Sequence, residues 1–402
     1  MESTDRRLRV LVLTSTFPRW ADDTEPVFVL ALCERLSHRF DICVLAPHAP
    51  GAKLTEQMTN GINVVRFRYF FCWGESLAYQ GGITAKLRSN PFRYFLVIPF
   101  LIGQWVALTH LLVRHQFDVV HAHWLFPQGF VAGITKVMLP RFPALVCTSH
   151  GTDINGLQSG FFSRIKRFTI RQSDAYTVVS RAMLSKALAL GATCKRTSVI
   201  SMGVDARALF TPDLDVPRAT RQILFVGRLD VQKGIELLIR AMPSILENYP
   251  DCSLRIVGAG PQLEALNEQV IALGMSQRIE FVGAVPNSEL PNHYRSATLV
   301  VFPSIGAEGL GLVCAEALAC ECPVVASDLP AVLEVVQHEV SGLIFRQNDC
   351  DDLVSKVLHM LSDPSWRKSM GTAGREHVLA HYDWRQVETD FEDVFMRAIQ
   401  HG

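Results

Sequence analysis

Hydrophobic residues in this chain gather in short runs of consecutive apolar positions, separated in many places by stretches with helical spacing. Such runs predict strands buried on both faces, which is typical of parallel sheets covered by helices. The strands predicted in the first half are Leu8–Thr14, Asp41–Ala46, Asn63–Phe67, Asp118–His121, Ala144–Ser149, Ala175–Ser180 and Ser198–Ser201. The helices predicted between them include Val27–Leu36, Gln128–Val137 and Arg181–Leu190.

The same alternation restarts in the second half, with predicted strands at Ile223–Val226, Leu254–Val257, Ile279–Val282, Leu299–Phe302, Pro323–Ala326 and Gly342–Phe345. Residues 204–220 between the halves are polar and contain proline, and they have no clear period, so they predict a linker. The pattern favours an α/β protein with two doubly wound, Rossmann-like domains facing a cleft. We place the domains at residues 1–203 and 204–381, and expect a C-terminal helix at 382–402 to pack back on the first domain.

One apolar segment, Tyr94–Val113, is about as long as a membrane span and contains no Asp, Glu, Lys or Arg. A lone span directly before a core strand would disrupt the alternating pattern, so a helix packed on the first domain is the favoured interpretation. A variant of it places the helix start on an anionic lipid surface, because Lys86, Arg88 and Arg93 flank that end.

Composition narrows the class of protein. Of the 402 residues, 49% are hydrophobic and 19% charged, and the formal net charge is zero, which indicates a folded protein and gives no sign of nucleic-acid binding. The ten cysteines form no Cys-x-x-Cys pair, which predicts reduced, structural thiols in the cytosol. The first residues do not read as a signal peptide.

Two cations follow the first strand of the second half. Arg228 and Lys233 lie in the sequence Gly227-Arg-Leu-Asp-Val-Gln-Lys-Gly234, just before a predicted helix. Fixed cations and backbone N–H groups at a helix start suit a diphosphate that gains charge as a bond breaks. A solvated turn carrying the same two residues is the alternative.

Two carboxylates follow the Leu299–Phe302 strand. Glu308 lies among Gly306, Gly309 and Gly311, and Glu316 comes after seven intervening residues, in an otherwise apolar helix. Glycines let a ligand approach the backbone closely. A carboxylate in an apolar helix needs hydrogen-bond donors, which the hydroxyls of a ribose can supply. The alternative places Glu316 on an exposed helix face. Cations and carboxylates together suit a nucleotide-sugar.

The chain resembles the retaining glycosyltransferases of family 4, which have the GT-B fold, over nearly its whole length and most strongly from about residue 221 to 345. Glu308 and Glu316 match the family's Glu-x7-Glu motif, which implies donor-sugar and ribose contacts, respectively. Arg228 and Lys233 match its diphosphate-binding pattern. The resemblance implies further donor contacts at Gly227, Val285, Gly309, Leu310, Gly311 and Leu312, with the base held near Val285.

The first domain carries weaker signals. His150, in Ser149-His-Gly-Thr-Asp153, resembles the family's histidine loop, which faces the reacting sugar; a capping or core histidine is the alternative. His121 and His123 match a strand end that commonly lines the acceptor side, and simple core packing remains open for both. Asp153 could instead cap a helix.

The first strand–helix loop departs from the family. Residues 15–20 read Ser-Thr-Phe-Pro-Arg-Trp where many members have a Gly-Gly pair that meets the donor phosphate. Arg19 either substitutes for that contact or is simply solvated.

The resemblance implies transfer of a hexose-type sugar from a UDP- or GDP-sugar to a hydroxyl of a glycan or lipid-linked acceptor, with Arg228, Lys233, Glu308 and His150 as catalytic residues. It implies no cofactor and no metal, and bacterial polysaccharide or cell-envelope biosynthesis at the inner membrane face. Asp213-Leu-Asp215 does not read as a metal motif because it lies in the linker. A nucleotide-sugar epimerase and a non-catalytic nucleotide-sugar-binding protein are the alternatives.

Overall fold

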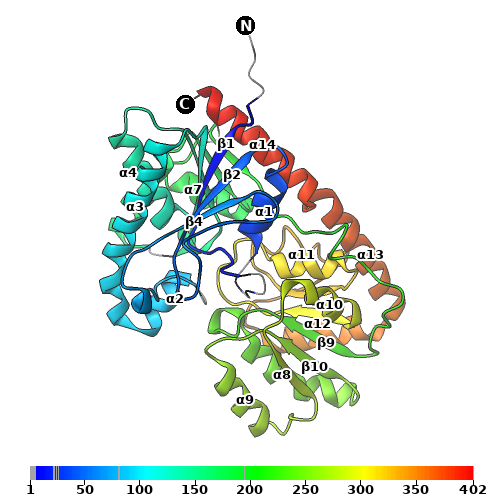
Figure 1. The fold of residues 1–402 in the computed structure, drawn as a ribbon. Coiled ribbons are helices and arrows are strands. Elements are labelled where there is room, and N and C mark those ends of the chain that lie inside the picture. Colours follow the sequence, from blue (N-terminus) through cyan, green and yellow to red (C-terminus); the bar gives the residue numbers. More distant parts are fainter. Residues whose placement is uncertain are drawn as a thin grey trace. The chain divides into compact units, whose positions relative to one another are not determined.

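The computed structural model describes residues 6–20, 23, 25, 27–79, 82–156, 158–193 and 195–401. The chain forms two compact units (Figure 1). The first consists of residues 1–201 and 387–402, and the second of residues 202–386. The helix predicted to return to the first unit from residue 382 therefore joins it from Val387 onward.

The first unit is built on an eight-stranded sheet with the order β3-β4-β2-β1-β5-β6-β7-β8. Its strands are β1 (Arg9–Leu13), β2 (Asp41–Pro47), β3 (Thr55–Gln57), β4 (Asn63–Phe67), β5 (Val119–His123), β6 (Ala144–Ser149), β7 (Ala175–Val178) and β8 (Thr197–Val199). All pairings are parallel except that of β3 with β4. The short, polar β3 was not predicted, because Thr-Glu-Gln has no apolar run to reveal it.

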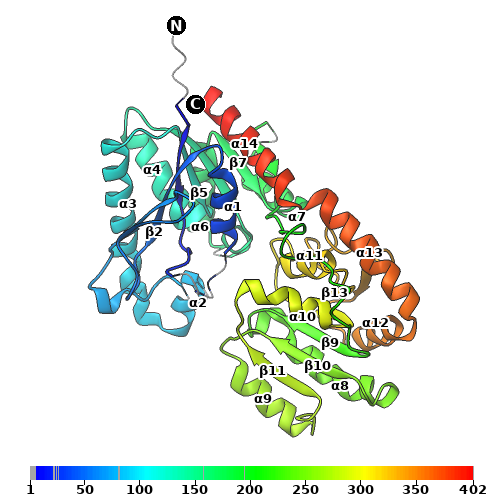
Figure 2. The same cartoon turned by 45° about the vertical axis from the view of Figure 1, so that its right-hand side comes forward.

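Helices cover this sheet on both faces, as the apolar runs predict. They are α1 (Phe28–Leu36), α2 (Gly82–Ser89), α3 (Val97–Arg114), α4 (Phe130–Met138), α5 (Thr152–Asn155), α6 (Gly160–Gln172) and α7 (Arg181–Ala189). Figures 1 and 2 show α3 and α4 side by side. Short helical turns lie at η1 (Cys72–Gly74), η2 (Pro91–Leu96) and η3 (Leu125–Gly129).

The second unit has a six-stranded parallel sheet with the order β11-β10-β9-β12-β13-β14. Its strands are β9 (Gln222–Val226), β10 (Ser253–Val257), β11 (Ile279–Gly283), β12 (Leu299–Phe302), β13 (Val324–Ser327) and β14 (Gly342–Phe345). Its helices are η4 (Val231–Lys233), α8 (Ile235–Asn248), α9 (Leu263–Ala272), η5 (Asn287–Glu289), α10 (Leu290–Ser296), α11 (Leu312–Ala319), α12 (Cys350–Ser362) and α13 (Pro364–His381). All six strands match the predicted ones to within one residue.

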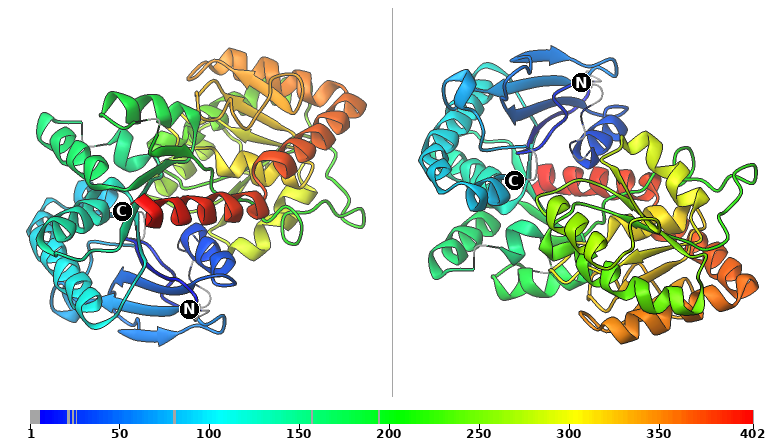
Figure 3. Two further views of the ribbon diagram at one scale, coloured as in Figure 1. Left: turned by 90° about the horizontal axis from the view of Figure 1, so that it is seen from above. Right: turned by 90° about the horizontal axis from the view of Figure 1, so that it is seen from below.

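The last helix, α14 (Trp384–His401), supplies apolar side chains to the first unit. The Phe395 ring lies 5.6 Å from that of Phe40 and 5.2 Å from that of His121, and Arg39 pairs with Glu392 at 2.8 Å. Figure 3 shows this red helix beside the blue elements of the unit. The two parallel-sheet units with a returning C-terminal helix confirm the predicted GT-B architecture.

Candidate active site

The strand order of the second unit brings the predicted donor residues to one edge of the sheet. β9 lies between β10 and β12, and the chain leaves it in one direction for β10 and later returns on its other side as β12. Loops that leave the carboxyl ends of strands at such a reversal flank the usual ligand position of an open parallel sheet. Arg228 and Lys233 follow β9, and Glu308 follows β12. Lys233 and Glu308, which are 75 residues apart in the sequence, therefore lie together at this switch point.

Asp230 organises the two cations. Its carboxylate accepts a hydrogen bond from Arg228 Nε at 2.7 Å and another from the backbone N–H of Lys233 at 3.2 Å. Gly234 then takes a left-handed conformation (φ 65°), and a Cβ there would lie 2.0 Å from the carbonyl oxygen of Pro303. Only glycine therefore lets the loop after β9 lie against the loop after β12.

Lys233 and Glu308 form an ion pair between these loops. Lys233 Nζ lies 2.7 Å from Glu308 Oε1, which also accepts a hydrogen bond from Ser304 Oγ at 2.5 Å. Lys233 Nζ is 5.3 Å from the centre of the Phe302 ring. The ammonium group is therefore held in place by a carboxylate and an aromatic face, and it is not a solvated lysine on a turn.

Glu316 is buried, with 7% of its surface exposed, so the alternative of an exposed helix face is wrong. Burial raises its pKa to about 7, while a hydrogen bond from the Tyr294 hydroxyl at 2.8 Å acts in the opposite direction. Tyr294 is itself fully buried, in α10, and no local sequence pattern indicates its role. The Glu316 carboxylate can accept more hydrogen bonds than the one from Tyr294, so it can also accept one from a ligand hydroxyl.

The glycine-rich loop leads directly into α11. Ile305 and Gly306 donate their N–H groups to the carbonyl of Gln232 at 2.8 and 3.0 Å, which ties this loop to the one after β9. Gly311 is the residue before α11 and has φ 95°, a conformation that favours glycine. Gly309, Leu310 and Leu312, the other predicted donor contacts here, all lie at this helix start.

Backbone groups at neighbouring strand ends form a close row. Gly227 donates its N–H to the carbonyl of Val257 at 3.0 Å, and Gly258 donates to that of Gly283 at 2.8 Å. A Cβ on Gly258 would lie 1.8 Å from the oxygen of Gly227, so the approach depends on glycine. Val285 follows two residues after β11, on the outer strand of this row.

The three histidines predicted as site residues, His121, His123 and His150, lie next to one another in the first unit. His123 Nδ1 lies 2.8 Å from His150 Nε2, and the two rings are stacked with centroids 5.0 Å apart. His121 Nε2 contacts Thr148 Oγ1 at 2.7 Å and its ring packs against Phe391 and Phe395.

Burial keeps these imidazoles neutral at physiological pH. It lowers the pKa of His121 and of His150 to about 3, and it lowers that of His123 well below the usual value. His121 and His123 are fully buried, as core packing predicts, whereas His150 is partly exposed.

Asp153 supports the loop that carries His150. Its carboxylate accepts hydrogen bonds from Ser149 Oγ at 2.7 Å, from the N–H of Leu125 at 2.8 Å and from that of Gly151 at 3.3 Å. The side chain is 8% exposed. Asp153 is therefore a positioning residue that joins the ends of β5 and β6.

Arg19 is neither solvated nor turned toward open solution. Its guanidinium makes two hydrogen bonds of 2.7 Å to the carboxylate of Asp23 and lies over the rings of Trp20 and Tyr79. This pairing raises the pKa of Arg19 and lowers that of Asp23. Ala21, Asp22, Thr24 and Pro26 of the same loop lie outside the described residues.

Within the described part of the chain, one group of three side chains has metal-ligand chemistry: His48, Cys72 and Glu75. It shares no residue with the candidate site. Its carboxylate is already engaged by Arg68 Nε at 2.9 Å and by the N–H of Tyr69 at 3.0 Å.

Two Rossmann-like units, with cations and carboxylates at the switch point of the second, define a protein of the GT-B glycosyltransferase class. Residues 26–208 match the family described as "Glycosyltransferase Family 4", and residues 210–377 match "Glycosyl transferases group 1". These two matches cover both units.

Individual proteins agree with these matches. An uncharacterised glycosyltransferase of Methanocaldococcus jannaschii is 30% identical over 391 residues, 91% of each chain. A GDP-mannose-dependent alpha-(1-6)-phosphatidylinositol monomannoside mannosyltransferase of Mycolicibacterium smegmatis is 30% identical over 69% of this chain and 76% of its own. The structure of sucrose-phosphate synthase from Thermosynechococcus elongatus superimposes with a TM-score of 0.82 at 21% identity, covering 98% of this chain and all of that one. The chain belongs to glycosyltransferase family 4.

Proposed function

We propose that this protein is a retaining glycosyltransferase that moves a hexose from a nucleoside-diphosphate sugar to a hydroxyl of a lipid-linked or glycan acceptor. The observation that carries the proposal is the cluster of Arg228, Lys233 and Glu308 at the switch point of the second sheet. Two cations and a carboxylate in this position match the diphosphate and the sugar hydroxyls of such a donor.

The diphosphate is the leaving group. When the glycosidic bond breaks, its electron pair stays on the phosphate oxygen, and Arg228 and Lys233 stabilise the added negative charge. The planar guanidinium of Arg228 can grip two oxygens, whereas Lys233 supplies one concentrated charge. Both cations are already held by carboxylates, Asp230 and Glu308, so little reorganisation precedes the reaction.

The acceptor hydroxyl attacks the face from which the diphosphate departs. Its oxygen forms the new bond to the sugar, and its proton passes to the departing phosphate oxygen, through an oxocarbenium-like state. Retention of configuration follows without a covalent enzyme intermediate. Glu308 orients the sugar in this scheme, and His150 offers a neutral imidazole to a sugar hydroxyl.

Glu316 and Val285 suit the nucleoside. The buried Glu316 carboxylate accepts hydrogen bonds from ribose hydroxyls, and backbone groups near Val285 hold the base. The Mycolicibacterium relative uses GDP-mannose, which supports a nucleoside-diphosphate hexose as the donor class. The same relative acts on a phosphatidylinositol mannoside, which supports a lipid-linked acceptor and a position at the inner face of the plasma membrane.

Calorimetric titration of UDP and GDP, with EDTA present, tests this proposal. We expect one nucleotide to bind without metal, and Arg228→Ala to lose most of that binding. Ligand at about a hundred times its dissociation constant should also stabilise the fold by about 2.7 kcal/mol, seen as a higher melting temperature. Absence of binding by both nucleotides, or a requirement for a divalent cation, would contradict it.

A second assay separates transfer from the alternatives. Incubation of the bound donor with a membrane lipid extract should transfer the sugar to lipid with retained anomeric configuration, which NMR can establish. Conversion of the donor sugar without acceptor would instead indicate an epimerase.

A further inference from the structure

The first unit exposes a concentration of large apolar side chains around η1, η2 and the start of α3. Phe71 is 66% exposed, Trp73 81%, Phe92 79%, Phe95 81% and Ile98 68%. Scattered exposed apolar residues are ordinary, but contiguous aromatic ones indicate an interaction surface. We call the surface formed by these five residues the aromatic face.

The helix α3 is apolar on two opposite sides. Phe100 and Leu108 are buried in the unit, together with the polar Gln104 between them. Ile98, Ile102 and Val106 recur every four residues along the opposite side and are more than half exposed. Helix residues of a water-surrounded protein are normally polar on the outward side, so this outward stripe lacks a partner.

Contacts within the unit join the helical part of this face to the η1 loop. The rings of Phe100 and Tyr69 lie 5.1 Å apart, and a Cβ on Gly103 would be 2.5 Å from the carbonyl oxygen of Arg68. The chain continues from Tyr69 directly into the exposed aromatic residues of η1. The two parts are therefore neighbours.

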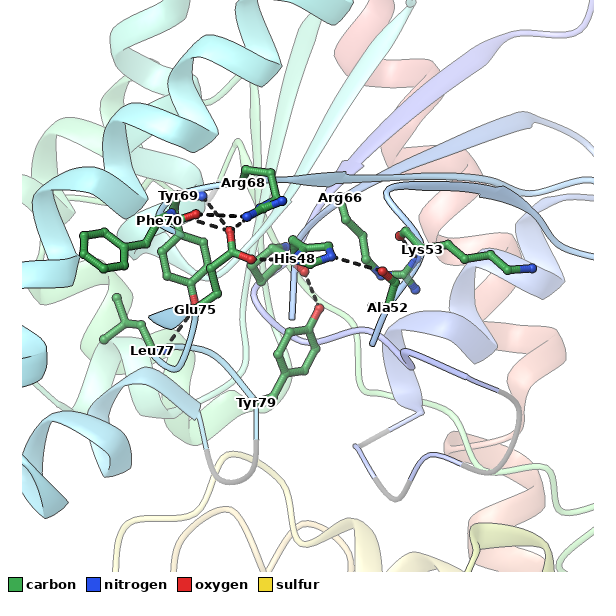
Figure 4. A network of polar contacts seen from close by, with 11 residues as sticks. His48, Ala52, Lys53, Arg66, Arg68, Tyr69, Phe70, Glu75, Leu77 and Tyr79 are labelled. Carbon is green, nitrogen blue, oxygen red and sulfur yellow. Dashed lines mark hydrogen bonds and ion pairs between the residues drawn. The ribbon is translucent and has the colours of Figure 1, made fainter. Parts of the chain in front are cut away.

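Glu75, directly after η1, forms polar contacts with Arg68, Tyr69 and His48, as Figure 4 shows. One carboxylate oxygen accepts from Arg68 Nε at 2.9 Å and from the N–H of Tyr69 at 3.0 Å, and the other contacts His48 Nδ1. His48 Nε2 in turn donates to the carbonyl of Ala52 at 3.0 Å, which fixes the ring.

This arrangement keeps the aromatic side chains outside. The rings of Phe71 and Trp73 stack on each other at 6.2 Å with 4° between their planes. The contacts of Glu75 and His48 restrain the loop, which reduces the conformational entropy lost when these rings are buried against a partner.

Apart from Glu75, which is buried and paired with Arg68, the charged residues of this region are basic. Residues 76–117 contain Lys86, Arg88, Arg93 and Arg114 and no Asp or Glu, although the whole chain has a net charge of zero. Arg93 donates to the carbonyl of Lys86 at 3.1 Å, so the basic end of α2 lies beside η2. A second copy of the same surface would bring like charges together, whereas anionic lipid head groups complement them.

We propose that the aromatic face is a docking surface for an anionic membrane, with Phe71, Trp73, Phe92 and Phe95 in the head-group region and with Lys86 and Arg93 against lipid phosphates. Aromatic side chains with flanking cations are typical of interfacial segments. The stretch Pro91–Arg114 is apolar and long enough to span a bilayer, and it is the one such stretch found in the described residues. Its buried side packs on the unit, which favours lying on the membrane over crossing it.

This inference rests on the proposed function in one respect, because a lipid-linked acceptor explains why a transferase would need the surface. Vesicle binding tests it without donor or acceptor. The full chain is sedimented with vesicles of phosphatidylcholine and phosphatidylglycerol in a two-to-one ratio, and with vesicles of phosphatidylcholine alone. We expect stronger binding to the anionic vesicles, weakened by salt.

The combined variant Phe71→Ser and Trp73→Ser should reduce vesicle binding by roughly a hundredfold, since removal of each aromatic side chain that becomes buried on membrane binding reduces binding about tenfold or more. The matched control is Ile271→Ser, because Ile271 is 69% exposed but lies on α9 of the second unit. Nucleotide binding should be unchanged in both variants, which shows that they are folded and separates this test from that of the proposed function.

Trp73 fluorescence provides a readout that needs no destabilising change. Vesicles with brominated acyl chains should quench and blue-shift the wild type, and the effect should largely disappear in Trp73→Phe. The proposal is overturned if wild type ignores anionic vesicles, if the double variant binds them like Ile271→Ser, or if ultracentrifugation shows that these substitutions abolish a dimer while lipid binding persists.

Discussion

The buried carboxylate of Glu316 makes the stability of this protein depend on pH in a predictable direction. Its pKa is about 7 in the folded chain against an ordinary value of 4.5, because burial disfavours the charged form. Between these values the folded state keeps a proton that the unfolded state has lost. Stability contributed by this group is therefore fully present below pH 4.5 and falls as pH rises through 7.

The size of the effect follows from the gap between the two pKa values. The two pKa values differ by about 2.5, and each pKa unit corresponds to about 1.4 kcal/mol. The free energy of unfolding should therefore fall by about 3 kcal/mol across that pH range. The comparison variant is Glu316→Gln, which has nearly the same shape, does not ionise and can still accept from Tyr294. Urea unfolding at several pH values from 4.5 to 8 should show wild type losing about 3 kcal/mol relative to the variant, with no further difference above pH 8.

Nucleotide binding should respond to the same ionisation with the opposite sign. Ribose hydroxyls donate hydrogen bonds to the ionised carboxylate, so nucleotide affinity should rise as pH rises through 7. Each tenfold gain in affinity corresponds to a pKa of Glu316 that is about one unit lower in the complex than in the free protein. A dideoxy nucleoside diphosphate is the control, because its phosphates titrate equally but it lacks both hydroxyls. The reasoning would be refuted if the free energies of unfolding of wild type and Glu316→Gln changed equally with pH. It would also be refuted if the nucleoside diphosphate and its dideoxy form bound with the same pH dependence.

Three further substitutions test separate parts of the site. Arg228→Ala should lower kcat at least about a hundredfold with an unchanged melting temperature, because it removes leaving-group stabilisation; near-normal turnover would exclude Arg228 from the mechanism. Tyr294→Phe should weaken nucleotide binding about tenfold in calorimetry, since it leaves a Glu316 oxygen without its donor, and equal affinity would contradict that role. Asp153→Ala should destabilise the fold by about 2–4 kcal/mol in urea unfolding, because it leaves the N–H of Leu125 without its acceptor and removes one of the two partners of the Ser149 hydroxyl; unchanged stability would show that the loop does not need it.

The fold was predictable because its strands are buried on both faces. Short apolar runs such as Ile223–Val226 and Leu299–Phe302 need burial on both faces, which a parallel sheet covered by helices provides. The structure confirms the two runs as β9 and β12. The edge strand β3 lacks this signal, since its residues Thr55–Gln57 are polar and largely outside the core. Prediction failed where burial did not constrain the sequence.

The candidate site was predictable in its residues more than in its contacts. Glu316 stands out in the sequence as a carboxylate in an apolar helix, but its partner Tyr294 comes 22 residues earlier in a helix of ordinary composition. Asp153 shows the converse. Its position beside His150 suggests a ligand contact, whereas three hydrogen bonds to the loop occupy its carboxylate. Pairings of this kind depend on tertiary structure and leave no local pattern.

The ion pair between Lys233 and Glu308 joins the loop after β9 to the glycine-rich loop after β12. Each residue was inferred for a different part of the donor, the cation for diphosphate and the carboxylate for sugar. At 2.7 Å they neutralise each other, and Ser304 holds the carboxylate as well. A donor that places its phosphate on Lys233 and a hydroxyl on Glu308 satisfies both groups at once, whereas a free diphosphate or a free sugar satisfies one and leaves the other less well paired. Under the proposed function, the pair thereby favours the intact nucleotide-sugar over either of its parts.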